Sequence, residues 1–160
     1  MANDFSHINN KDQPTMVDVG DKKESVRTAH ARSVITLTKE LVQLLDNKDI
    51  QTKKGPVFQT AILAGIMACK QTSSLIPLCH PLALDKCNVE IQIVNELDVQ
   101  IDCTVKTTGK TGVEMEALTG SSVAALTVYD MCKAFSHDLV IKETKLMEKS
   151  GGKNDFRREM

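Results

Sequence analysis

The sequence predicts an α+β fold, because stretches that alternate in polarity with a period of two stand beside stretches with helical composition. Residues 26–37, VRTAHARSVITL, place small and apolar residues at every second position. Residues 88–106 hold two more alternating runs joined by the turn sequence NELD, which predicts an antiparallel hairpin. Residues 57–69 are apolar on nearly all sides, and residues 112–135 lack proline and are rich in Ala, Leu, Glu and Met. These two segments predict a buried helix and a long helix.

Local signals fix the remaining elements. Thr38 can cap a short helix over 39–45. Pro56 suits the first turn of the buried helix, where a missing N–H costs no hydrogen bond. A last strand is expected over 139–146. The order strand, two helices, two strands, helix, strand is that of a ferredoxin-like split βαβ unit. We therefore expect an antiparallel sheet with one added helix and with the helices packed on one face.

Length and composition predict a single domain over residues 1–160. With 160 residues, 41% of them hydrophobic, the chain can bury a sizeable core. Residues 1–24 are polar and should form an N-terminal arm that becomes ordered only against another surface. Residues 149–160 combine two adjacent glycines with basic residues and should form a mobile basic tail.

The charge balance argues against a nucleic-acid partner. The chain has 20 Lys and Arg against 21 Asp and Glu, and four Phe, one Tyr and no Trp offer few rings for base stacking. No apolar run approaches the ~20 residues that span a bilayer, and no basic, apolar leader is visible. These features predict a cytoplasmic protein with no membrane partner.

The cysteines and histidines do not predict a metal site. Five cysteines include no C-x-x-C pair, and four histidines include no i, i+4 pair. The expected state of the cysteines is reduced, with most of them buried.

A histidine between two prolines marks the most distinctive loop, LIPLCHPL. Pro77 and Pro81 restrict their own backbone and that of the preceding residues, so His80 is held in an extended and stiff segment. A stiff loop loses little entropy on binding and suits a ligand-binding side chain. The alternative is that the prolines only separate two elements and His80 is structural.

The long helix carries ionisable residues near both ends. Asp130 and Lys133 are spaced i, i+3, so they form either a solvated surface pair or an acid and base pair beside a packed face. Glu114 and Glu116 lie in the first turns, where acids complement the helix dipole. The sequence TTGKTG precedes them but lacks the glycine that a phosphate loop requires at position 104. It leaves a glycine-flanked helix start that favours an anion.

Several motifs together resemble the cyclic pyranopterin monophosphate synthase family over nearly the whole chain. They are FSHIN, MVDVGDK, AGIMACK, LIPLCHPL, TTGKTGVEMEALT, AALTVYDMCKA and KSGGK. The resemblance implies a lyase of molybdenum cofactor biosynthesis. Its reaction converts (8S)-3′,8-cyclo-7,8-dihydroguanosine 5′-triphosphate into cyclic pyranopterin monophosphate and pyrophosphate. It also implies a ferredoxin-like fold assembled as a homohexamer, a trimer of dimers, with the site near a subunit boundary.

The resemblance also implies roles for individual residues. Catalytic roles fall on Asp130, Lys133 and Lys54. Contacts with the substrate fall on Leu78, Cys79, His80, Glu114, Met115, Glu116, Arg27, Lys149 and Lys153, the last three near the triphosphate. No cofactor is expected to be required, although Mg²⁺ could accompany the pyrophosphate. Three departures from the family pattern are Pro56, Ile62 and the shortened tail KSGGKND.

The chemistry of these residues suits the implied reaction. Ring opening and closure need proton transfers that Asp, Lys and His can perform. Attack of a sugar hydroxyl on the α-phosphorus needs positioning and charge neutralisation by Lys and Arg. On one unbroken helix, Glu116 and Asp130 would lie roughly 21 Å apart, which predicts a site shared across a two-fold interface. The alternative is a non-catalytic ferredoxin-like module that senses a metabolite and would not need Asp130 and Lys133 together.

Overall fold

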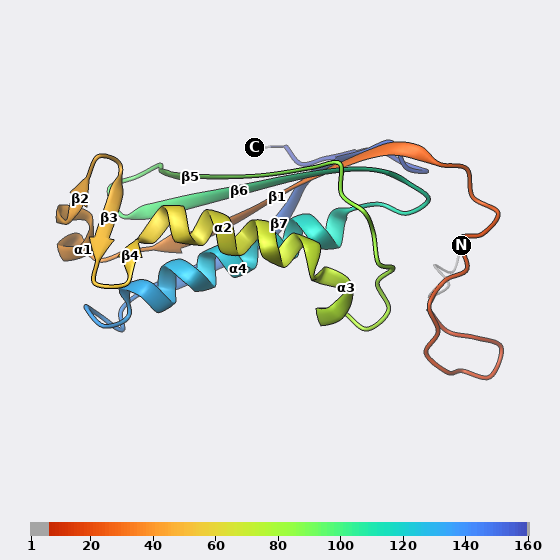
Figure 1. The fold of residues 1–160 in the computed structure, drawn as a ribbon, viewed down its shortest axis with the longest axis horizontal. Coiled ribbons are helices and arrows are strands. Elements are labelled where there is room, and N and C mark those ends of the chain that lie inside the picture. The colour runs from red at the N-terminus through yellow and green to blue at the C-terminus, as the bar shows by residue number, and fades with distance from the viewer. Residues whose placement is uncertain (1–6, 160) are drawn as a thin grey trace.

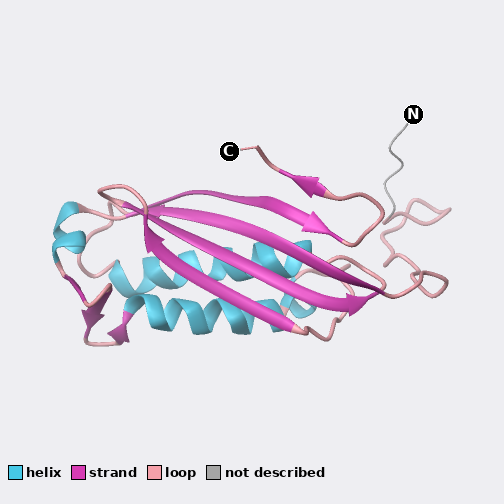
Figure 2. Cartoon of the chain, turned by 90° about the horizontal axis from the view of Figure 1, so that it is seen from above, coloured by secondary structure: helices cyan, strands magenta, loops and turns pink. Residues whose placement is uncertain are grey.

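The computed structural model describes residues 7–159, which fold into two layers. One layer is an antiparallel sheet, and two long helices cover one of its faces (Figure 1). Seen from above, the strands lie over both helices (Figure 2). A small three-stranded sheet sits at one end, and the N-terminal segment lies at the other (Figure 1). Within the described residues, no helix is long and apolar enough to cross a membrane.

The elements have the following bounds. The strands are β1 (Ser25–Thr36), β2 (Leu45–Asp46), β3 (Asp49–Thr52), β4 (Gly55–Pro56), β5 (Lys86–Ile93), β6 (Asp98–Gly109), β7 (Val140–Ser150) and β8 (Phe156–Arg157). The helices are α1 (Lys39–Gln43), α2 (Val57–Lys70), α3 (Thr72–Leu75) and α4 (Glu114–Cys132). The large sheet has the order β5-β6-β1-β7-β8 with every neighbour antiparallel. The predicted α+β class, the antiparallel sheet and the single helix-covered face are thus confirmed.

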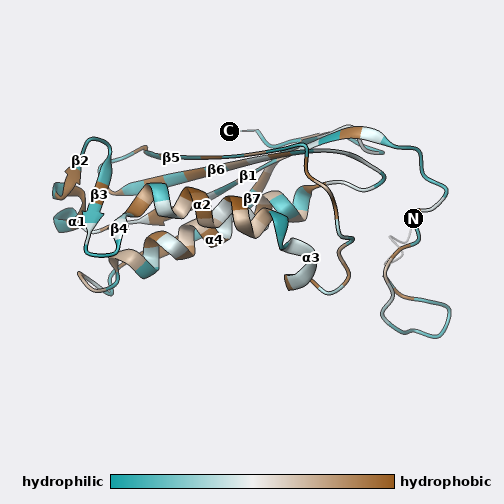
Figure 3. Ribbon diagram, viewed as in Figure 1, coloured by the Kyte–Doolittle hydropathy of each residue, from teal (hydrophilic) through white to brown (hydrophobic). Residues whose placement is uncertain are grey.

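The alternating strands bury one face each, as the period of two predicts. In β1, Ala29, Ala31 and Ile35 are fully buried beneath the helices. In β6, the fully buried residues are Val99, Ile101, Cys103 and Val105. Successive hydrophobic and hydrophilic bands along β5 and β6 display this pattern (Figure 3). Burial of one face fixes the register, because a slip of one residue would expose the whole apolar set.

Helix α4 packs closely on α2 and the sheet because its inward face consists mostly of small residues. Gly120 marks the tightest contact. A Cβ atom there would overlap Cys69 Sγ and lie 2.7 Å from Cys103 Sγ. The predicted long helix is confirmed and runs without interruption from Glu114 to Cys132. The expected free cysteines are also confirmed, and three of the five are buried.

The segment from 45 to 56 forms three short strands that the sequence patterns did not predict. Asn47 and Lys48 turn the chain between β2 and β3 with positive φ values of 48° and 69°. The buried Asp49 carboxylate accepts hydrogen bonds from the backbone N–H groups of Phe58 and Gln59, at 2.7 and 3.1 Å. Pro56 at the N-cap makes no side-chain hydrogen bond. The Asp49 side chain, seven positions earlier in the sequence, takes over the capping of α2.

Two further differences concern the helices and the C-terminal segment. The predicted short helix capped by Thr38 is confirmed as α1, but a further short helix, α3, follows α2 and was not expected. Strand β7 runs to Ser150, beyond the expected end at 146, so the expected tail boundary at 149 lies inside this strand. The chain then folds back as β8, which pairs with β7. Gly151 makes this turn with φ 81°, and a Cβ atom there would overlap Val26 O.

Candidate functional site

A cavity of about 290 Å³ lies at the N-terminal end of α4. Three segments far apart in the sequence line it: the N-terminal arm, the loop between α3 and β5, and the start of α4. The loop contributes Leu78, Cys79 and His80, and the helix contributes Glu114, Met115 and Glu116. All six residues that the sequence resemblance assigned to substrate contacts in these two motifs therefore meet at one cavity.

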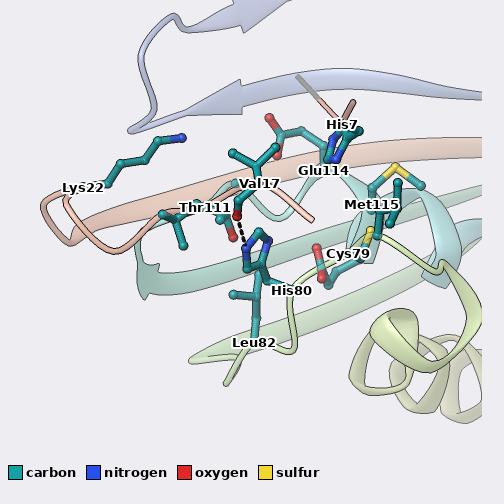
Figure 4. Close-up of a pocket in the computed structure, with 13 residues that line it drawn as sticks. His7, Val17, Lys22, Cys79, His80, Leu82, Thr111, Glu114 and Met115 are labelled. Atoms are coloured by element: carbon teal, nitrogen blue, oxygen red, sulfur yellow. Dashed lines mark hydrogen bonds between the residues drawn. The ribbon is translucent and has the colours of Figure 1, made fainter. Parts of the chain in front are cut away.

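His80 joins the loop to the N-terminal arm. Its Nε2 lies 2.7 Å from the carbonyl oxygen of Val17, and Figure 4 shows this hydrogen bond beside the cavity. A carbonyl only accepts, so Nε2 carries a proton and donates it. In the neutral ring, Nδ1 is then unprotonated and can accept a hydrogen bond. The arm expected over residues 1–24 is thus docked at Val17, while residues 1–6 lie outside the described part.

Glu116 supplies a carboxyl group with unusual proton affinity. Only 4% of the residue is exposed. Burial raises the pKa of its carboxyl group above the ordinary value, and the negative charge of Glu114 raises it further. The pKa of the Cys79 thiol is also raised, by burial and then by the charge of Glu116. A carboxyl group with a raised pKa beside a cavity is a candidate for proton transfer.

A second, cationic cavity of about 170 Å³ adjoins the first and shares Gly112 and Glu114 with it. Arg27, Lys149 and Lys153 line it, so the structure brings together the three residues predicted near a triphosphate. Lys149 Nζ lies 3.0 Å from Glu114 Oε1. The start of α4 lies between the two cavities. Its N-cap residue, Val113, makes no side-chain capping hydrogen bond. The positive end of the helix dipole favours an anion there.

The remaining predicted residues gather at the opposite end of α4. Lys133 Nζ lies 2.6 Å from Asp130 Oδ1, and Lys54 Nζ lies 3.3 Å from Asp130 Oδ2. The two lysines hold the pKa of the Asp130 carboxyl group below its usual value, and Asp130 raises the pKa of Lys133. A cavity of about 390 Å³ adjoins this group. All three side chains are more than half exposed, so within one chain the pair is not at a dry site.

The predicted site residues therefore form two groups that one chain does not bring together. Glu116 and Asp130 belong to the same unbroken helix. Fourteen residues at a rise of 1.5 Å place their Cα atoms roughly 21 Å apart. Figure 1 shows the two ends of α4 at opposite sides of the molecule, one beside the loop that follows α3 and the other beside β3 and β4.

Some lining residues were not identified as site residues from the sequence. His7, Val17, Lys22 and Thr111 line the first cavity. They lie within or beside the motifs FSHIN, MVDVGDK and TTGKTG, which supply the signal that could have identified them. Lys110 donates a hydrogen bond of 2.6 Å to Gly20 O, so the TTGKTG loop also holds the arm in place.

Residues 16–152 match the family model described as the MoaC family. The chain belongs to the MoaC family. Both groups of site residues lie within the matched range, except for His7 and Lys153.

Individual MoaC relatives show the same similarity. The chain is 51% identical over 169 residues to "Molybdenum cofactor biosynthesis protein 1" of Dictyostelium discoideum, and the match covers 95% of the chain. It is 50% identical over 155 residues to a "Molybdenum cofactor biosynthesis bifunctional protein" of Synechocystis, covering 94% of the chain. These matches span 27% and 45% of the two relatives' own lengths. A "Cyclic pyranopterin monophosphate synthase" of Xanthomonas campestris is 49% identical, with 95% of the chain and 92% of the relative covered.

Proposed function

We propose that this MoaC-family chain is a cyclic pyranopterin monophosphate synthase in molybdenum cofactor biosynthesis. The substrate is (8S)-3′,8-cyclo-7,8-dihydroguanosine 5′-triphosphate, and the products are cyclic pyranopterin monophosphate and pyrophosphate. One observation carries the proposal: a cationic cavity adjoins a second cavity lined by His80 and Glu116. This pairing suits a ligand with a triphosphate at one end and a heterocycle at the other. The Xanthomonas relative, named for this activity, is similar over nearly its full length.

The cationic cavity serves the phosphate chemistry. A sugar hydroxyl attacks the α-phosphorus and pyrophosphate leaves, so the β and γ phosphates carry the negative charge that must be neutralised. Arg27, Lys149 and Lys153 are placed to do this. Lys149 exchanges its Glu114 partner for a phosphate oxygen when substrate binds. No resident cofactor is needed, and Mg²⁺ would accompany the pyrophosphate rather than occupy a site of its own.

The two groups at the ends of α4 serve the proton transfers. His80 and Glu116 hold and protonate the ring system at one end. Asp130, with Lys133 and Lys54 beside it, remains ionised as the base at the other end. Both groups can act on one small substrate only if they come from different chains. We therefore infer that each site is shared across a two-fold interface, where the start of α4 in one chain meets the end of α4 in its partner.

The exposed apolar residues support assembly. Leu63 and Met67 lie one turn apart on α2 and are 64% and 54% exposed, and Leu126 on α4 is 57% exposed. Burial of such residues between copies would stabilise an oligomer. The hexamer built as a trimer of dimers, and the location in the cytoplasm, are parts of the same proposal. So is the ferredoxin-like unit, which the order β5-β6-β1-β7 supports.

The substitution Asp130→Asn tests the catalytic role. It keeps the size of the side chain and removes the charge, so pyrophosphate release should fall by roughly a hundredfold or more while substrate binding is retained. Glu90→Gln, an exposed carboxylate on β5, is the matched control and should turn over normally. If Asp130→Asn releases pyrophosphate at the same rate as the Glu90→Gln control, Asp130 is only a member of a surface ion pair. Release of the ligand unchanged by the unsubstituted protein would favour the sensing module.

A further inference from the structure

Three cysteines from distant parts of the chain meet beneath the sheet. Cys69 comes from α2, Cys87 from β5 and Cys103 from β6, and their Sγ atoms all lie within 4.8 Å of one another. Cys69 Sγ and Cys103 Sγ are 3.6 Å apart. Among residues 7–159, this is the group of His, Cys, Asp and Glu side chains close enough together to hold a metal ion. We call it the thiol cluster.

The fold explains why these side chains converge. In the pairing of β5 with β6, Val89 lies opposite Cys103 and Cys87 lies opposite Val105. Cys87 and Cys103 are therefore diagonal neighbours on the helix-facing side of the sheet. Gly120 permits the approach of α4, since any side chain there would collide with the sulfurs of Cys69 and Cys103.

The distances suit a single ion. Three sulfurs no more than 4.8 Å apart all lie within roughly 2.8 Å of a common central point, only ~0.5 Å beyond a Zn–S bond of ~2.3 Å. Small rotations of the side chains would close this difference. A disulfide, in contrast, would use two of the three sulfurs and would require the Cys69–Cys103 separation of 3.6 Å to shrink to ~2.05 Å.

The ligand set selects a soft cation. All three donors are sulfur, which favours Cu⁺ and Zn²⁺ over Mg²⁺ or Ca²⁺. We propose that Cys69, Cys87 and Cys103 bind one thiophilic d¹⁰ cation, Cu⁺ or Zn²⁺. Each thiol that binds loses its proton to solvent as its sulfur–metal bond forms, and no electron is transferred. Three thiolates complete a trigonal Cu⁺ site, whereas Zn²⁺ would take a water as its fourth ligand.

The cation has a route to the cluster. Cys69 and Cys103 are 2% and 0% exposed, but Cys87 is only half-buried. Cys87 also lies on β5, the edge strand of the large sheet, so no further strand covers it. An ion can bind first to Cys87 and then recruit the two buried sulfurs.

An ion bound to the thiol cluster would alter the proposed active site through one hydrogen bond. Cys69 Sγ donates a hydrogen bond of 3.2 Å to the backbone oxygen of Glu116. A metal-bound thiolate has no proton to donate, so this bond is lost when the ion binds. The same turn of α4 directs the Glu116 side chain into the first cavity.

Titration of the full chain tests the proposal. The protein is kept reduced with a phosphine, stripped with EDTA, and titrated separately with Zn²⁺ and with Cu⁺ against a colorimetric chelator for each ion. At least one of the two ions should bind at one per chain by native mass spectrometry, and Mg²⁺ should not. Since loss of an outer-shell partner already weakens metal sites 10–100-fold, Cys87→Ser should lower the affinity by roughly a hundredfold or more. Cys132→Ala, another buried cysteine, should bind within about threefold of the unsubstituted chain.

Thiol labelling keeps the test independent of how the variants fold. A bound ion should slow alkylation of Cys87 while the half-buried Cys79 reacts at an unchanged rate. The proposal is overturned if neither ion binds at one per chain, or if Cys87→Ser retains the affinity of the unsubstituted chain. Protection of Cys79 in place of Cys87 would likewise overturn it, because the ion would then lie in the proposed active site.

Discussion

Mixing two inactive variants tests whether each active site is shared between chains. Asp130→Ala removes the carboxylate at the C-terminal end of α4, and His80→Ala removes the imidazole beside its N-terminal end. The two groups belong to cavities at opposite ends of an unbroken helix. If both groups act on one substrate, a dimer with one copy of each variant has one site with both defects and one site with neither.

The expected recovery follows from counting. When subunits exchange at random in an equal mixture, half of the dimers contain one copy of each variant, and one of the two sites in each such dimer is intact. Activity should therefore reach about a quarter of the value for the unsubstituted protein. The assay measures pyrophosphate release before and after exchange, and mass spectrometry of differently labelled chains shows that exchange has occurred.

A matched mixture distinguishes shared sites from trivial recovery. Asp130→Ala and Lys133→Ala both alter the same end of α4, so every site in their mixed dimers carries one defect. This mixture should stay inactive. No recovery with Asp130→Ala and His80→Ala, after proven exchange, would refute the shared site. Equal recovery in both mixtures would refute it as well.

Three further predictions concern ligand binding, packing and pH. Lys149→Ala should weaken binding of the triphosphate substrate roughly 10–100-fold and binding of the monophosphate product less, because only the substrate carries the β and γ phosphates proposed to contact Lys149. Such a charge-assisted contact is worth ~1.5–3 kcal/mol. Gly120→Ala gains ~1 kcal/mol of helix propensity, but the added methyl group meets two sulfur atoms, and such overpacking costs ~1–3 kcal/mol. The free energy of unfolding, measured by thermal denaturation, should therefore fall by about 1 kcal/mol. Lys142 and then Thr36 lower the pKa of Asp98 to about 2. The stability that this carboxylate contributes is present above its unfolded pKa near ~3.9 and is lost as the pH falls towards 2. The difference in melting temperature between Asp98→Asn and the unsubstituted protein should therefore be full at pH 6 and should shrink below pH 4.

Specific results would contradict each of these three predictions. Equal losses of affinity for substrate and product would place Lys149 away from the β and γ phosphates, and Lys145→Ala on β7 serves as the lysine control. Adding Cys69→Ala to Gly120→Ala should recover part of the lost stability, whereas strictly additive effects would mean that the sulfur is not the obstacle. A melting-temperature difference for Asp98→Asn that does not change between pH 6 and pH 2 would show that its charge does not stabilise the fold.

The elements that could be predicted from the sequence are those with a long internal period. β1, the β5–β6 hairpin, α2 and α4 each extend over enough residues for a period of 2 or 3.6 to show. Strands β2, β3 and β4 are two to four residues long and cannot display a period. Their turn adopts positive φ without glycine, and the Asp49 carboxylate accepts a hydrogen bond from the backbone N–H of Phe58 at the start of α2. Such a contact becomes visible only in three dimensions.

The candidate site shows the same division between local and distant information. Motifs identified His80, Glu116 and Asp130 because each lies in a distinctive local sequence. The pairing of Lys54 with Asp130 joins residues 76 positions apart, and no spacing rule reaches that far. The thiol cluster was not predicted because its three cysteines also lie far apart in the sequence. Sequence rules for metal sites look for cysteines with two to four residues between them, whereas here strand register and helix packing bring the sulfurs together.

The uninterrupted course of α4 has a consequence for how the chain can change over evolutionary time. Removing one residue between Glu116 and Asp130 would shorten the helix by ~1.5 Å and rotate everything beyond it by ~100°. Asp130 would then face away from Lys54, and the apolar residues that precede it would leave the core. A substitution along α4 keeps the relative positions of its two ends, but a change in its length does not. Insertions and deletions among homologous chains should therefore fall in the turns at 94–97 and 134–139 and should spare the fourteen-residue interval inside this helix.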